Sequence, residues 1–80
     1  MSTTLLPWDE ARPGYFLRKT PANTTAGIVS LVYPNDARPW YWAAFCPTGS
    51  EGAGEQRVAT REEAEEMADA ALRRMGYALT

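Results

Sequence analysis

The C-terminal quarter of the chain constrains the fold most, because residues 60–76 carry both ends and the buried face of one helix. Thr60 and Glu63 form a Thr-x-x-Glu capping box. Gly76 stands where a left-handed residue commonly ends a helix. The residues between them predict a single long helix with one apolar stripe, made of Ala64, Met67, Ala68, Ala71, Leu72 and Met75.

Three stretches before this helix are rich in aromatic and β-branched residues and are bounded by proline or glycine. They predict strands at 15–20, 27–33 and 40–46, with a possible edge strand at 55–59. Residues 1–13 are expected to form an N-terminal arm pinned by Leu5, Leu6 and Trp8, and residues 47–54 a flexible loop. Short connections favour antiparallel pairing. The expected fold is α+β: a three- to four-stranded antiparallel sheet at 14–59, followed by the helix packed on one face, within a single domain.

Cysteine content and charge limit the cellular compartment and the classes of partner that we expect for such a domain. The 80 residues include one cysteine, Cys46, whereas a secreted domain this short normally needs several disulfides. The first eight residues lack the pattern of a signal peptide, and the longest apolar stretch is far shorter than the roughly 20 residues that span a bilayer. We therefore expect a cytoplasmic protein without a membrane partner. A net charge of −2 argues against a general nucleic-acid binder.

The residues required for common catalytic and metal sites are missing from the sequence. There is no histidine, which removes the usual general base and the commonest metal ligand. Cys46 lies in an apolar segment and is expected to be a small buried hydrophobe. The glycine-rich residues 49–54 lack the Gly-Lys-Ser/Thr of a phosphate-binding loop. We expect a non-enzymatic protein with no cofactor and no metal.

Four carboxylates on the predicted helix are the first candidate binding surface. At 100° per residue they fall within a sector of roughly 100° opposite the apolar stripe. This surface, called the acidic ridge below, is either a solvated outer face or a negative patch for a basic protein surface such as a nucleic-acid channel. It consists of Glu62, Glu65, Glu66 and Asp69.

The aromatic residues of the 40–46 segment form the second candidate surface. Alternation places Trp40 and Trp42 on one face and Tyr41 and Phe45 on the other. With one helix, only one sheet face is covered, so one of these pairs is the more exposed. An exposed Trp pair could stack bases of a single strand, with Arg18 and Lys19 as cationic neighbours. The alternative is that the tryptophans fill the core.

Residues 52–72 resemble the last strand and helix of double-stranded RNA-binding domains. That helix opens with a basic Lys-Lys-x-Ala-Lys motif in the family. Here residues 61–65 read Arg-Glu-Glu-Ala-Glu, with acidic residues in place of the lysines. Phosphate binding by this helix is therefore not expected.

The whole chain resembles small phage and prophage accessory proteins of the anti-CRISPR type. The likeness lies in length, the sheet-plus-helix pattern, the acidic balance and the missing catalytic groups. It implies a stoichiometric inhibitor that blocks DNA binding by a multi-subunit (type I) CRISPR surveillance complex, or Cascade, with the acidic ridge opposite basic residues of the complex. The protein would act as a monomer or weak homodimer. The alternatives are a single-stranded nucleic-acid or regulatory binding module, and a structural subunit of a virion.

Overall fold

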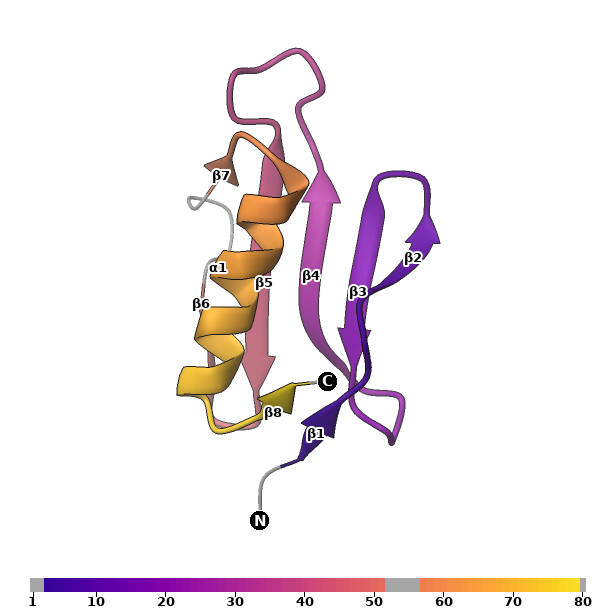
Figure 1. The fold of residues 1–80 in the computed structure, drawn as a ribbon, viewed down its shortest axis with the longest axis vertical. Helices are drawn as coiled ribbons and strands as arrows, with labels where there is room; N and C mark the ends of the chain where they lie inside the picture. The colour runs from indigo at the N-terminus through magenta and orange to yellow at the C-terminus, as the bar shows by residue number, and fades with distance from the viewer. Residues whose placement is uncertain (1–2, 52–56, 80) are drawn as a thin grey trace.

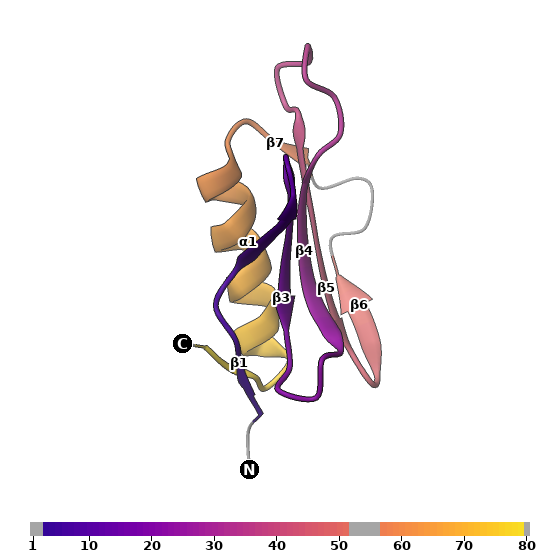
Figure 2. The same cartoon turned by 90° about the vertical axis from the view of Figure 1, so that its right-hand side faces the viewer.

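A computed structural model of the chain describes residues 3–51 and 57–79. An antiparallel sheet forms one layer and a helix the other (Figures 1 and 2). The predicted α+β class is confirmed. The strands follow the order β2-β3-β4-β5-β6, and β7 pairs with β5 as well. The sheet consists of β2 (Asp9–Arg12), β3 (Tyr15–Lys19), β4 (Thr25–Leu31), β5 (Trp40–Cys46), β6 (Gly49–Glu51) and β7 (Arg57–Val58).

The helix α1 (Arg61–Arg74) begins and ends where the sequence predicts. The hydroxyl of Thr60 accepts a hydrogen bond from the backbone N–H of Glu63 at 3.1 Å. At the other end, Gly76 has a φ of +99° and donates to the carbonyl of Arg73, while Tyr77 donates to that of Leu72. These two bonds form a Schellman motif, which satisfies carbonyls at the end of the helix.

The sheet is larger than predicted because two segments expected to be irregular pair with it. Part of the expected N-terminal arm forms β2, since a Pro13-Gly14 turn, with Gly14 at a φ of +74°, brings Arg12 opposite Tyr15. Part of the expected flexible loop forms β6. The predicted edge strand is present as β7, although its positions 55 and 56 lie outside the described residues.

A short parallel pairing connects the two ends of the described chain. Strand β1 (Thr4–Leu5) pairs with β8 (Ala78–Leu79), and the side chain of Leu5 is fully buried. The residues after the helix therefore return to the core, where Tyr77 and Leu79 pack against the buried cluster.

The core lies between α1 and one face of the sheet. Phe16, Val29 and Trp42 stand in register across β3, β4 and β5 and face the helix. The helix meets them with Leu72 and three fully buried alanines, whose small side chains allow a close approach. Met67, predicted to lie in the apolar stripe, is instead exposed, because it lies at the margin of the buried helical face.

Candidate binding surfaces

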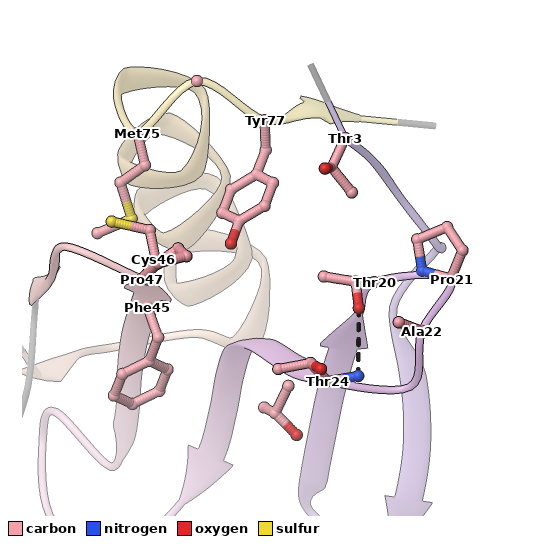
Figure 3. A pocket seen from close by; sticks show the side chains of 12 residues that line it. Thr3, Thr20, Pro21, Ala22, Thr24, Phe45, Cys46, Pro47, Met75 and Tyr77 are labelled. Atoms are coloured by element: carbon pink, nitrogen blue, oxygen red, sulfur yellow. Dashed lines mark hydrogen bonds between the residues drawn. The ribbon is translucent and has the colours of Figure 1, made fainter. Parts of the chain in front are cut away.

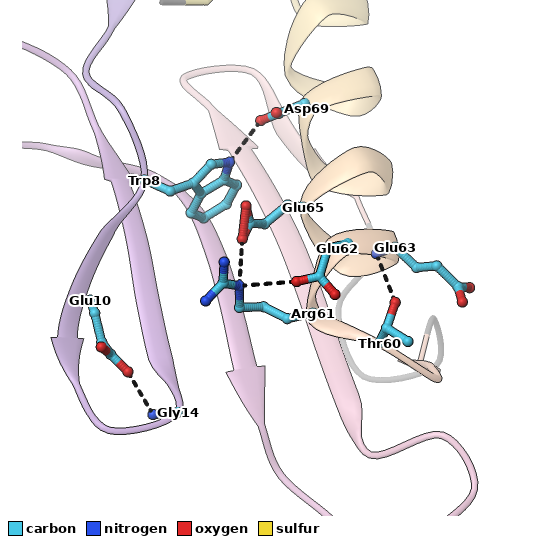
Figure 4. Close-up of polar contacts among 9 residues, drawn as sticks. All are labelled: Trp8, Glu10, Gly14, Thr60, Arg61, Glu62, Glu63, Glu65 and Asp69. Carbon is cyan, nitrogen blue, oxygen red and sulfur yellow. Dashed lines mark hydrogen bonds and ion pairs between the residues drawn. The ribbon is translucent and has the colours of Figure 1, made fainter.

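Two carboxylates of the predicted acidic ridge make intramolecular contacts (Figure 4). The carboxylate of Asp69 accepts a hydrogen bond from Trp8 Nε1 at 3.1 Å and lies 3.9 Å from Nε of the buried Arg18. That of Glu65 lies 2.9 Å from Nε of Arg61. Their side chains are only 21% and 22% exposed. Both belong to the helix flank that faces the N-terminal segment, a position that the helical period alone could not predict.

The other two residues of the acidic ridge, Glu62 and Glu66, are exposed to solvent. The side chain of Glu62 is 73% exposed, and its carboxylate lies 3.7 Å from Nε of Arg61. An exposed pair at this distance is worth little energetically. The structure therefore separates the ridge into an outward half, Glu62 and Glu66, and an inward half, Glu65 and Asp69.

The predicted aromatic and cationic surface is not brought together. Trp42 and Arg18 are each 3% exposed and face α1. Trp40 faces the same way and packs against Phe16, with ring centroids 6.3 Å apart. Lys19 lies on the opposite face by alternation, and its Nζ donates to Asn23 Oδ1 at 3.3 Å. Base stacking by Trp42 is thus prevented by the helix that covers it, whereas Trp40 is half-buried.

The sheet face turned away from α1 carries a set of large apolar side chains that sequence alternation partly predicted. No helix lies on this face in the part of the chain that the structure describes (Figure 2). By register these side chains stand on neighbouring strands, and all are half-buried. We call this surface the open sheet face: Tyr15, Leu17, Ile28, Tyr41 and Phe45.

The middle of the open sheet face contains a residue that is fully buried. Ala43 is fully buried there, with Ile28 opposite it and with Tyr41 and Phe45 on either side along β5. Ala43 does not belong to the core cluster beneath the helix. A sheet with one solvated face normally alternates apolar and polar residues. Strand β5 departs from this rule because it is apolar on both faces.

Charged groups of both signs border the open sheet face. The Arg12 guanidinium lies over the Tyr15 ring, 4.5 Å from its centroid. Lys19 stands two residues beyond Leu17 on the same side of β3, and Asp9 of β2 pairs opposite Leu17. Arg57 stands opposite Tyr41. The border is therefore mixed in charge rather than uniformly basic.

Arg57 also braces the β4–β5 loop, which projects beyond the body of the protein (Figure 1). Its guanidinium lies 4.6 Å from the centroid of Tyr33, and its NH1 lies 3.5 Å from Asp36 Oδ2 and donates to the carbonyl of Arg38 at 3.3 Å. The backbone N–H of Arg38 donates to Asp36 Oδ1 at 2.9 Å, which lowers the pKa of Asp36, with a smaller lowering from the Arg57 charge. The exposed side chains of Val32 and Tyr33 are thus presented by a braced hairpin.

The described residues offer no metal centre and no membrane span. No three histidine, cysteine or acidic side chains in this part of the chain lie where they could hold a metal ion together. No helix in it has both the length and the apolar character to cross a bilayer. Cys46 is half-buried, and its thiol lies 3.3 Å from the hydroxyl of Thr48.

No family model, curated protein or solved structure matches this chain. The function is therefore argued from its surfaces.

Proposed function

We propose that this chain is a non-enzymatic protein-binding domain whose contact surface is the open sheet face. The observation that carries the proposal is the set of five large apolar side chains on three neighbouring strands of the sheet face that α1 does not cover, with Ser30 of β4 between Tyr15 and Tyr41. Contiguous apolar surface of this kind, bordered by polar residues, marks interaction sites in soluble proteins. Tyrosine and arginine, which are both present at this surface, are enriched among residues that dominate binding energies.

The chemistry of the open sheet face favours a protein partner over a single-stranded nucleic acid. Its centre is aliphatic, with Leu17 and Ile28 side by side on β3 and β4, and aliphatic groups give no stacking platform. The Tyr15 ring already carries the Arg12 guanidinium on one side. The mixed border also lacks the basic footprint that phosphate binding requires. An apolar centre within a polar rim is instead the usual anatomy of a protein interface.

A standard interface buries about 800 Å² on each partner. This is roughly one sixth of the 4950 Å² of accessible surface of the chain. A specific complex would therefore need neighbouring surface, such as the braced β4–β5 loop, in addition to the open sheet face.

The test is a binding comparison between two lysine variants. Leu17→Lys places a charge in the centre of the open sheet face, and Glu63→Lys places one on the exposed side of α1. Proteins retained from host lysate by each immobilised variant are quantified by mass spectrometry, and any candidate is purified and titrated calorimetrically. A true partner should bind the wild type and Glu63→Lys with one-to-one stoichiometry. It should bind Leu17→Lys at least tenfold more weakly. If every retained protein binds both variants equally, the open sheet face is not the contact surface.

The outward half of the acidic ridge supports a second candidate function. Glu62 and Glu66 lie one turn apart and project to solvent, which suits docking onto a basic nucleic-acid-binding surface. In this proposal the protein is a stoichiometric inhibitor of a type I CRISPR surveillance complex. Glu66→Lys should then weaken inhibition of DNA binding by the purified complex, while Glu63→Lys, the same charge change on the same helix, should not. Equal inhibition by both variants would reject the acidic ridge as the docking surface.

A further inference from the structure

A cavity of about 690 Å³ opens at the end of the molecule opposite the β4–β5 loop (Figure 3). Segments far apart in the sequence converge around it: the N-terminal segment at Thr3, the β3–β4 turn, the end of β5 and the residues that follow α1. Its volume lies within the range of about 300 to 1,000 Å³ that is typical of small-molecule sites. Phe45 belongs both to the lining of the cavity and to the open sheet face, so the two surfaces meet at this residue.

The lining of the cavity is apolar on one side and hydroxyl-bearing on the other. Met75 and Cys46 present their sulfur atoms from one wall, and Thr20 and Pro21 stand across from them (Figure 3). The Tyr77 hydroxyl points into the space between these walls. The Thr20 hydroxyl accepts a hydrogen bond from the backbone N–H of Thr24 at 3.2 Å and keeps its own proton for another acceptor.

The twelve described residues that line the cavity include no charged side chain. A charged ligand would lose hydration without gaining a counter-charge, which is unfavourable. A neutral ligand loses little hydration free energy and gains contact with the thioether of Met75, which is a soft and adaptable apolar surface. The hydroxyls of Tyr77 and Thr20 can orient one polar group of the ligand.

We propose that this cavity is a binding site for a small uncharged ligand with an apolar body and one hydrogen-bonding group. The apolar body lies against Met75 and Pro21, and the polar group meets the Tyr77 hydroxyl. This proposal does not rest on the proposed protein-binding function, although the two surfaces share Phe45.

The experiment is a titration of the 15N-labelled protein with phenol, toluene, benzoate and benzylammonium, followed by amide chemical shifts. Phenol is expected to shift the amides of Cys46, Met75 and Tyr77, and to bind at least about tenfold more tightly than either charged probe, which corresponds to about 1.4 kcal/mol. Tyr77→Phe, which keeps the ring and removes the hydroxyl, should weaken phenol several-fold and leave toluene unchanged. Tyr41→Phe, the same change on the open sheet face, should alter neither.

Four results would overturn the proposal. One is the absence of saturable shifts around the cavity with phenol. Another is equal binding of the neutral and charged probes. The third is a Tyr77→Phe variant that binds phenol as wild type does. Amide shift changes confined to the open sheet face would also reject this site. In that case, their loss in Leu17→Lys would show that the probe binds the open sheet face. An unchanged phenol affinity in Leu17→Lys supports the independence of the two sites.

Discussion

The two faces of β5 have nearly the same apolar character but different surroundings. On one face, Trp42 is covered by α1 and joins the core. On the other, Tyr41 and Phe45 are half-buried, and Ala43 between them is fully buried. Apolar character alone therefore does not decide which face of the sheet becomes part of the core. What separates them here is the single helix, which can cover one face of the sheet.

The largest expected effect is a difference in stability between the two faces. Trp42→Ala removes a side chain that is packed under the helix and should cost about 3 to 5 kcal/mol of unfolding free energy. Tyr41→Ala, one position away on the open sheet face, should cost about 1 kcal/mol or less, because its side chain is only half-buried and lies on the face turned away from α1. Urea unfolding followed by far-UV circular dichroism measures both. Equal losses would mean that the open sheet face is a second core.

The close packing on the covered face gives the next largest effect. A Cβ added at Gly27 would lie 2.9 Å from Cη2 of Trp8 and 3.3 Å from Cδ1 of Leu72. Gly27→Ala should therefore cost about 1 to 3 kcal/mol through overpacking. In a double-mutant cycle, Trp8→Ala should remove much of this penalty, because it vacates the space that the methyl group needs. Strictly additive losses of unfolding free energy would show that the contact with Trp8 does not cause the penalty of Gly27→Ala.

The inward and outward halves of the acidic ridge can be compared in the same way. Asp69→Ala removes the acceptor of the Trp8 indole and a carboxylate beside the buried Arg18, which should cost about 1 to 3 kcal/mol. Glu66→Ala removes an exposed carboxylate and should stay within about 0.5 kcal/mol. Thermal unfolding of the two variants side by side tests this. A cost at Glu66 equal to that at Asp69 would contradict the division into inward and outward halves.

The smallest expected effect concerns Asp36 in the β4–β5 loop, whose pKa is lowered from 3.8 chiefly by the backbone N–H of Arg38. Because the folded-state pKa is the lower one, this contribution to stability is present above pH 3.8 and is lost as the pH falls through the folded-state pKa. Carboxyl NMR titration of Arg57→Ala should show a pKa for Asp36 that is still lowered, because the Arg38 hydrogen bond remains. A return to 3.8 in that variant would assign the effect to Arg57 instead.

The elements that the sequence predicted well are those whose signals are local. Thr60, Glu63 and Gly76 specify both ends of α1 through contacts within a few residues of themselves. The strand at 40–46 follows from an uninterrupted apolar run, and its alternation correctly separates the two tryptophans from Tyr41 and Phe45. Which of these faces meets the helix could not be predicted, because both are apolar.

The features that the sequence did not predict depend on distant partners. Strand β2, with its four exposed residues, forms because the Pro13-Gly14 turn returns the chain along β3. The inward half of the acidic ridge depends on Trp8 and Arg18, and Trp8 is separated from Asp69 by 61 positions. Helical period places a carboxylate relative to its own helix, but not relative to a segment that packs on the helix flank.

The β1–β8 pairing has a consequence for the order of events during synthesis. Thr4 pairs with Ala78, and Leu5, which pairs with Leu79, belongs to the buried core cluster. Contacts between such distant positions form late, because loop-closure entropy opposes them until other structure is in place. On the ribosome, this closing contact must wait until β8 has emerged. Until then Leu5 lacks its partner strand.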